Sequence, residues 1–91
     1  MKKPATKAER EHMNAVAELG CAICKRPAQV HHVANQGVRA SHYETIPICG
    51  YHHTDGPHGE AIHQGRRTWE ARFGTERELL VKTLQQLKKS V

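Results

Sequence analysis

Cysteines and histidines, which bind transition metals more readily than most side chains, are concentrated in one part of the sequence. All three cysteines and seven of the eight histidines lie within 43 consecutive residues. Cys21 and Cys24 form a C-x-x-C pair, and Cys49 and His52 form a C-x-x-H pair after 24 intervening residues. Two such pairs can close on one ion, usually tetrahedral Zn²⁺. The sequence therefore predicts a structural zinc site, in which His53 is an alternative to His52 as the fourth ligand.

The remaining histidines of this stretch have the chemistry of a hydrolytic site. His31 and His32 are adjacent in a predicted strand, so their side chains should point to opposite faces. One imidazole can bind a metal while its neighbour acts as a general base near neutral pH. A metal there would stabilise the negative charge that develops on a phosphate. His53, His58 and His63 are the other candidate ligands of this second metal.

The elements that must position these residues can be read from capping and periodicity. Thr6 and Glu9 have the spacing of a capping box and predict a helix over residues 7–19. Pro47 restricts the strand that contains it to a sheet edge or to the strand's end. The other predicted elements are strands over residues 28–33 and 43–48, a loop over residues 35–41, and helices over residues 67–73 and 76–89.

Together these elements predict one α+β domain over residues 1–91. Its expected parts are a basic arm at residues 1–6, the first helix at 7–19, a metal-binding core at 20–65 and C-terminal helices at 66–91. Only 37% of the residues are apolar and only four are aromatic. A core of that size needs further support, which the free energy of zinc binding would supply.

Charge and composition narrow the class of partner and the compartment. The formal net charge is +5 and the sequence pI is about 9.4, which favours a polyanion such as DNA. There is no apolar run long enough to span a membrane and no signal-peptide pattern, so a cytoplasmic protein with metal-binding thiols is expected. The candidate phosphate contacts are Lys25, Arg39, Arg66 and Arg67.

The order of these motifs resembles that of the HNH endonucleases, whose fold is the ββα-metal or His-Me finger. The resemblance covers about residues 20–75. Six runs within it resemble, more specifically, the phage recombination-enhancement nucleases, which are RecA-dependent HNH-type DNases. These runs are VHHV at residues 30–33, RASHY at 39–43, TIPIC at 45–49, HH at 52–53, IH at 62–63 and GRRTWEARFG at 65–74.

The resemblance implies a treble-clef-like ββα-metal core and divalent-metal-dependent hydrolysis of DNA phosphodiester bonds. His32 matches the general base of the family's motif, and His31 and His53 match metal ligands. Either His58 or His63 would complete the site, with Mg²⁺, Mn²⁺ or Zn²⁺ bound there. The implied setting is phage or prophage recombination in the cytoplasm of a bacterial host.

One motif position departs from the family. The middle residue is usually Asn and holds the hairpin loop by hydrogen bonds, whereas here it would fall at Glu44 or Thr45. The resemblance also implies RecA-coated DNA as a partner. Members that bind RecA filaments carry a long basic N-terminal arm, but here only residues 1–7 precede the first helix, so dependence on RecA stays open. We expect a monomer or a weak dimer.

Two other classes of function remain compatible with these residues. A zinc-knuckle DNA-binding or adaptor protein would use the cysteine pairs without catalysis. A small partner-binding module would act through the apolar face of the last predicted helix and would have no affinity for DNA. That face consists of Leu79, Leu80, Leu84 and Leu87.

Overall fold

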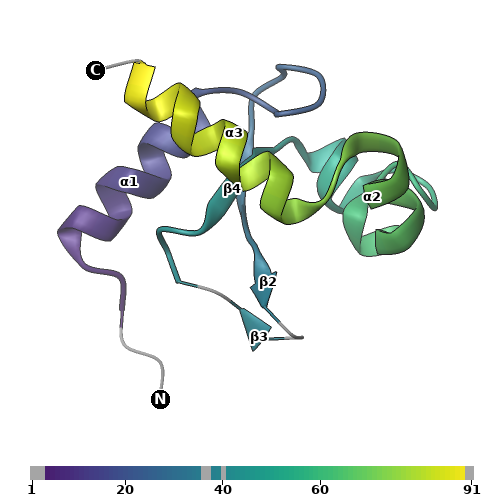
Figure 1. Cartoon of the computed structure of the whole chain (residues 1–91), viewed down its shortest axis with the longest axis horizontal. Coiled ribbons are helices and arrows are strands. Elements are labelled where there is room, and N and C mark those ends of the chain that lie inside the picture. Colours follow the sequence, from purple (N-terminus) through teal and green to yellow (C-terminus); the bar gives the residue numbers. More distant parts are fainter. Residues whose placement is uncertain (1–3, 36–37, 40, 90–91) are drawn as a thin grey trace.

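The computed structural model describes residues 4–35, 38–39 and 41–89 of the 91-residue chain. Figure 1 shows a small α+β fold in which helices surround short antiparallel strand pairs. In chain order the elements are α1 (Lys7–Glu18), β1 (Gln29–His32), β2 (Ala34–Asn35), β3 (Val38–Arg39), β4 (Thr45–Ile48), the π-helical turn η1 (Tyr51–Asp55), the 3₁₀ turn η2 (Ile62–Gln64), α2 (Arg66–Phe73) and α3 (Glu76–Lys89).

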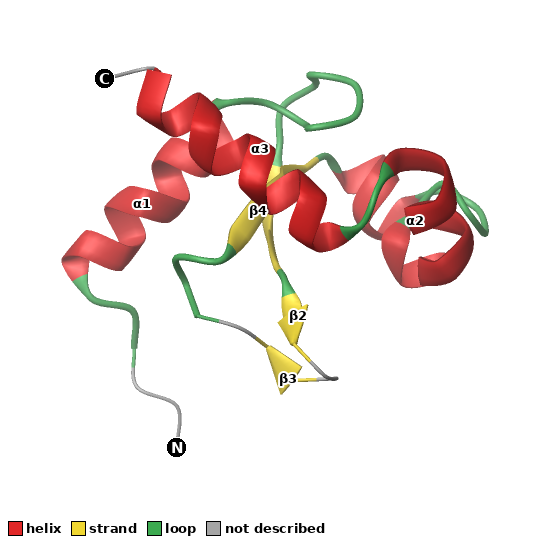
Figure 2. Ribbon diagram, in the orientation of Figure 1, coloured by secondary structure: helices red, strands yellow, loops and turns green. Residues whose placement is uncertain are grey.

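The strands form one long hairpin that is interrupted in the middle. β1 pairs antiparallel with β4, with His31 opposite Ile46 and His32 opposite Thr45. Beyond Val33, β2 and β3 form a second antiparallel pair. The loop predicted over residues 35–41 was therefore partly wrong, because short strands continue the hairpin into it. Figure 2 shows this second pair projecting from the body of the molecule.

The helices begin where the capping boxes predicted. Thr6 accepts a hydrogen bond from the backbone N–H of Glu9 at 3.1 Å, and Glu9 accepts one from the backbone of Thr6 at 2.8 Å. Thr75 and Glu78 repeat the exchange at the start of α3, at 3.1 and 2.9 Å. Each box satisfies backbone donors that the first turn leaves without partners. The predicted helix over residues 76–89 is confirmed, and the first helix ends one residue earlier than predicted.

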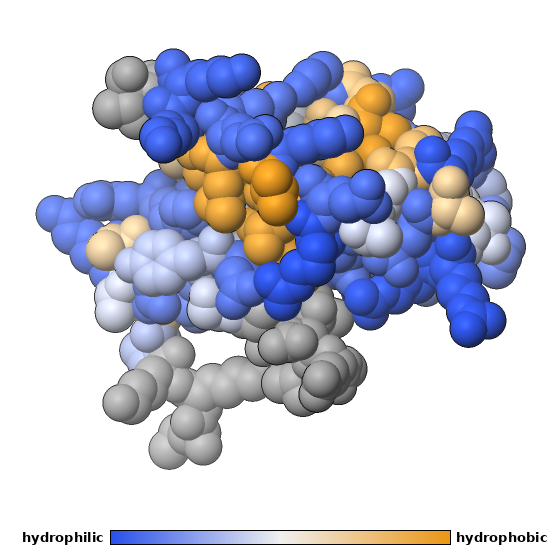
Figure 3. All heavy atoms as spheres, in the orientation of Figure 1, coloured by the Kyte–Doolittle hydropathy of each residue, from blue (hydrophilic) through white to orange (hydrophobic). Residues whose placement is uncertain are grey.

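The core lies where α1 and α3 pack against β4. Trp69 of α2 is fully buried and belongs to the same core cluster. Leu79 and Leu80 are buried as predicted, but Leu84 is 42% exposed, so the apolar face of α3 enters the core only through its first half. Figure 3 shows apolar side chains in patches near the centre and toward the upper right of the viewed face, with hydrophilic side chains between and around them. None of the helices in the described residues is long and apolar enough to cross a membrane.

Candidate metal centres

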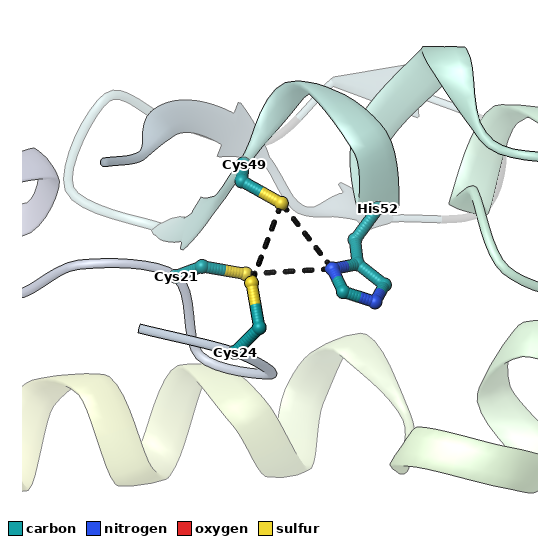
Figure 4. A group of neighbouring side chains, drawn as sticks. All are labelled: Cys21, Cys24, Cys49 and His52. Atoms are coloured by element: carbon teal, nitrogen blue, oxygen red, sulfur yellow. Dashed lines mark hydrogen bonds between the residues drawn. The ribbon is translucent and has the colours of Figure 1, made fainter. Parts of the chain in front are cut away.

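Four potential zinc ligands converge at one end of the core, and we call them the cysteine cluster: Cys21, Cys24, Cys49 and His52. Figure 4 shows the sulfurs and the imidazole Nδ1 pointing toward one another from a turn after α1, the end of β4 and η1. The Cys24 and Cys49 sulfurs are 3.6 Å apart, and His52 Nδ1 lies 3.2 Å from Cys49 Sγ and 3.9 Å from Cys21 Sγ. Tetrahedral Zn²⁺ requires about 3.8 Å between sulfurs and about 3.6 Å between sulfur and nitrogen. The side chains therefore fit a zinc ion.

The turn that carries Cys21 and Cys24 has the backbone of a metal knuckle. Lys25 has a positive φ of 67°, and its N–H donates to the Cys21 carbonyl at 2.9 Å. Gly20 has a φ of +82°, and a Cβ there would lie 2.9 Å from the Lys25 carbonyl oxygen. The Ile23 N–H donates to Cys21 Sγ at 3.4 Å. This conformation turns the chain tightly enough to aim both sulfurs at one point.

The pKa values of the two buried thiols of this cluster are shifted in opposite directions. Burial tends to raise the pKa of the Cys21 thiol, but backbone hydrogen bonds outweigh it and bring that pKa below its ordinary value. Burial raises the pKa of the Cys49 thiol; a hydrogen bond from the His52 backbone offsets this only in part, and the neighbouring thiols Cys24 and Cys21 raise the pKa further. Because thiolate is the form that binds metal, the knuckle backbone already favours the ligand form of Cys21.

Three histidines form a second group, which we call the histidine cluster: His31 of β1, His53 of η1 and His63 of η2. His53 Nε2 lies 3.2 Å from His31 Nδ1 and 3.0 Å from His63 Nε2. Nitrogens that share a tetrahedral Zn²⁺ lie about 3.3 Å apart. Three imidazole nitrogens from three separate elements thus meet at the spacing of ligands on one ion.

The outer nitrogens of two of these rings face oxygen acceptors. His31 Nε2 lies 2.8 Å from a carboxylate oxygen of Glu76, and His53 Nδ1 lies 2.8 Å from the amide oxygen of Gln29. An acceptor oxygen requires the ring proton on the nitrogen that faces it, so the inner nitrogens carry lone pairs. Lone pairs at about 3 Å repel one another unless a cation lies between them. The donor set and its tautomers therefore fit a metal ion.

Burial weakens the competition between protons and a metal ion for the imidazole nitrogens of this cluster. Burial lowers the pKa of His53 and of His63, and neighbouring imidazoles lower both further. A lowered pKa keeps an imidazole neutral to lower pH than an ordinary histidine, and the neutral form is the metal ligand. These two rings are thus prepared to bind metal at and somewhat below neutral pH.

Adjacent histidines of η1 divide between the two clusters. His52 faces the cysteines and His53 faces His31 and His63, because successive side chains leave a helical turn in different directions. This single π-helical turn therefore contributes to both groups; such turns are frequent at functional sites. His58 lies outside both clusters, where its Nε2 is 3.3 Å from the Thr68 hydroxyl.

His32 lies beside the histidine cluster, at the same pocket. The pocket has a volume of about 600 Å³ and is lined by His31, His32, His53, His63, Arg66, Glu76 and neighbouring apolar residues. His32 Nε2 is 2.9 Å from His42 Nδ1, and the Thr45 hydroxyl donates to the His42 carbonyl at 3.4 Å. Thr45, one of the two candidates for the middle motif residue, thus holds the hairpin loop by a hydrogen bond. Glu44, the other, forms an ion pair with Arg77 on α3.

The predicted phosphate contacts have different surroundings. Arg66 lines the pocket, but it is already ion-paired with Glu76 and, at 3.5 Å, with Glu70. Arg67 and Lys25 are exposed. The side chain of Arg39 lies outside the described part of the structure, as do Lys2 and Lys3 of the predicted basic arm. The pocket rim therefore carries one cation held by carboxylates, and further cations lie on the surface.

Sequence reasoning missed the two residues that orient the histidine cluster. Gln29 is two positions before His31, so it lies on the same face of β1; this spacing was a usable signal. Glu76 is 45 residues from His31 in sequence, and its only local feature is a place in the first turn of α3. That place is ordinary for an acidic residue and gives no hint of a histidine partner.

Comparisons with known proteins give the family. The sequence model of the family described as recombination enhancement, RecA-dependent nuclease matches residues 5–88, nearly the whole chain. No curated protein matches the chain. The matched segment contains both clusters, His32 and Glu76. The chain belongs to the recombination-enhancement, RecA-dependent nuclease family.

Proposed function

We propose that the protein is a metal-dependent HNH-type endonuclease that hydrolyses DNA phosphodiester bonds in recombination, working as a single nuclease domain. The family supports nuclease action in recombination. The order of β1, β4 and the helical turn η1 supports a ββα-metal core, because metal-ligand candidates lie on β1 and on the turn that follows β4. The cysteine cluster would hold a structural zinc that ties this core together.

The observation that carries the proposal is the convergence of three imidazole nitrogens at the wall of an open pocket. His31, His53 and His63 would hold the second metal. Three neutral imidazoles suit Zn²⁺ or another transition metal better than Mg²⁺, which prefers oxygen ligands. Three protein ligands also leave a coordination position open, as in catalytic zinc sites. When bound, the ion would supply stabilisation of charge on the scissile phosphate and the leaving oxygen.

His32 would act as the general base. Its Nε2 lies 2.9 Å from His42 Nδ1, and the imidazole of His32 would take a proton from the attacking water. His42 would fix the direction of the ring, and the Thr45 hydroxyl would hold the backbone of His42. His32 lines the same pocket as the three ligand candidates, which supports a base that works on the phosphate bound there.

DNA would approach along the cationic rim of the pocket. Arg66 lines that rim, and Arg67, Lys25 and Arg39 would add backbone contacts that carry no sequence preference. The net charge of +5 favours the same polyanion. The family description supports DNA bound by RecA as the form that is cut, and such DNA belongs to the bacterial cytoplasm.

The proposal is tested by cleavage of single-stranded and duplex DNA, with and without RecA filaments, in Zn²⁺, Mn²⁺ or Mg²⁺. His32→Ala should lower the cleavage rate by about 10²–10⁴-fold, the usual contribution of a general base, while metal content and DNA binding stay unchanged. His58→Ala is the matched control, because His58 lies outside both clusters. Equal rates for wild type and His32→Ala would overturn the assignment. DNA binding without cleavage under every condition would favour a non-catalytic zinc-knuckle adaptor instead.

A further inference from the structure

We propose that Glu76 is a positioning residue, which fixes the ring of His31 so that Nδ1 is the nitrogen offered to the metal. This inference deepens the proposed function and depends on the histidine cluster being a metal site. Glu76 belongs to α3, whereas the three histidines come from β1, η1 and η2. The carboxylate would therefore connect the last helix of the fold to the metal centre.

Glu76 is a buried carboxylate with both a hydrogen-bonding and a charged partner. The residue is 2% exposed, and its Oε2 accepts a hydrogen bond from His31 Nε2 at 2.8 Å. Its other oxygen forms an ion pair with Arg66. Burying a carboxylate is costly unless charged or hydrogen-bonding partners surround it. Its partners include a metal-ligand candidate, His31, and a cation that lines the pocket, Arg66.

A purely local role in starting α3 does not account for this burial. Thr75 and Glu78 already form the capping box of the helix. Other ion pairs that link separate elements are much more exposed: Arg77 and Glu44 are 49% and 37% exposed in their side chains. Glu76 is held in place by its own backbone N–H, which donates to the Glu70 carboxylate at 3.1 Å. Its side chain contacts His31, outside its own helix.

The chemical consequence follows from the tautomer. A proton on His31 Nε2, donated to Glu76, leaves the lone pair on Nδ1, which lies 3.2 Å from His53 Nε2. A carboxylate behind an imidazole also makes that imidazole a stronger donor to a metal. Loss of such an outer partner typically weakens metal binding by about 10–100-fold. Glu76 should contribute an effect of that size.

The test measures Zn²⁺ affinity of the histidine cluster by chelator competition, in full-length protein whose cysteine cluster is already loaded. Glu76→Gln keeps the shape of the side chain and removes its charge, and it should weaken binding by about 10–100-fold. Glu11→Gln is the matched control, because Glu11 pairs with Lys7 within α1 and lies outside both clusters. It should leave the affinity unchanged. Equal affinities for the Glu76→Gln variant and the wild type would overturn the inference.

A second readout does not depend on the variant folding. Nitrogen NMR of the wild type, with the histidine cluster free of metal, should show His31 protonated at Nε2; protonation at Nδ1 instead would overturn the inference. Neither measurement uses DNA, so the two proposals fail separately. Weaker binding in Glu76→Gln together with a wild type that never cleaves DNA would reject only the nuclease function. Normal cleavage, together with an unchanged Zn²⁺ affinity in Glu76→Gln and His31 protonated at Nδ1 in the wild type, would reject only the role of Glu76.

Discussion

The two clusters share a helical turn but differ in closure. The cysteine cluster has four candidate ligands, of which Cys21 and Cys49 are buried, and four is the number that a closed tetrahedral site requires. The histidine cluster has three, one of them exposed, and it faces a pocket. A complete set leaves an ion no room for substrate, whereas three ligands leave a place for water or phosphate. The difference teaches that ligand number and exposure separate a site suited to structure from one suited to chemistry.

The two clusters also differ in the groups that hydrogen-bond to their candidate ligands. In the cysteine cluster the backbone supplies hydrogen bonds, such as the Ile23 N–H on Cys21 Sγ. In the histidine cluster side chains supply them, through Glu76 and Gln29. Backbone donors come with the fold of the knuckle and cannot be substituted one at a time. Side-chain acceptors can be changed singly, so the histidine cluster is the one that mutation can adjust without rebuilding the chain.

The largest effect should come from opening the cysteine cluster. Cys49→Ser removes a sulfur that lies near both Cys24 and His52. Binding of a structural zinc contributes on the order of 10 kcal/mol in small zinc domains, so losing one ligand should leave most of the protein unfolded. Circular dichroism with and without added Zn²⁺ measures this. A Cys49→Ser protein that melts like the wild type would show that no ion supports the core.

The next largest effects should come from removing one or the other of the two adjacent histidines of η1, His52 and His53. His52→Ala should lower the melting temperature and expose the knuckle to chelators, because it opens the four-ligand set. His53→Ala should keep the fold and lose the metal of the histidine cluster, with cleavage reduced by at least about 10²-fold. Metal content per chain and thermal melting distinguish the two variants. If both variants lost the same ion, the division between adjacent histidines would be wrong.

The sequence predicted those features whose partners are close along the chain. The capping boxes Thr6–Glu9 and Thr75–Glu78 join residues three apart, and both are present. The C-x-x-C spacing likewise predicted a knuckle, because the geometry of so short a turn is nearly fixed. Such local relations depend little on the rest of the fold, so spacing alone is enough to find them.

Relations that depend on the packing of distant elements could not be predicted in this way. Whether His52 or His53 faces the cysteines depends on the phase of a π-helical turn, which adjacent residues do not reveal. The choice between His58 and His63 depends on where η2 packs against η1. Glu76 needed the placement of α3 against the strands. In each case the chemistry of the residue was visible, but its direction was set by tertiary structure.

The smallest effect should come from Gln29, which orients His53 as Glu76 orients His31. Its amide oxygen lies 2.8 Å from His53 Nδ1, but Gln29 is exposed and uncharged. Water can replace a neutral acceptor at an exposed position with little loss. Gln29→Leu should therefore weaken Zn²⁺ binding to the histidine cluster by less than about 10-fold, at the low end for such partners.

Gln29→Glu is the informative companion, because it places a carboxylate behind His53. Its affinity should equal or exceed that of the wild type, since a charged acceptor strengthens the hydrogen bond to the ring N–H. Chelator competition, with the cysteine cluster loaded, measures both variants against Glu76→Gln. A loss in Gln29→Leu as large as in Glu76→Gln would mean that burial does not set the strength of these outer contacts. An unchanged melting temperature in both variants would place the effect in the histidine cluster, because the amide oxygen of Gln29 contacts His53, a member of that cluster.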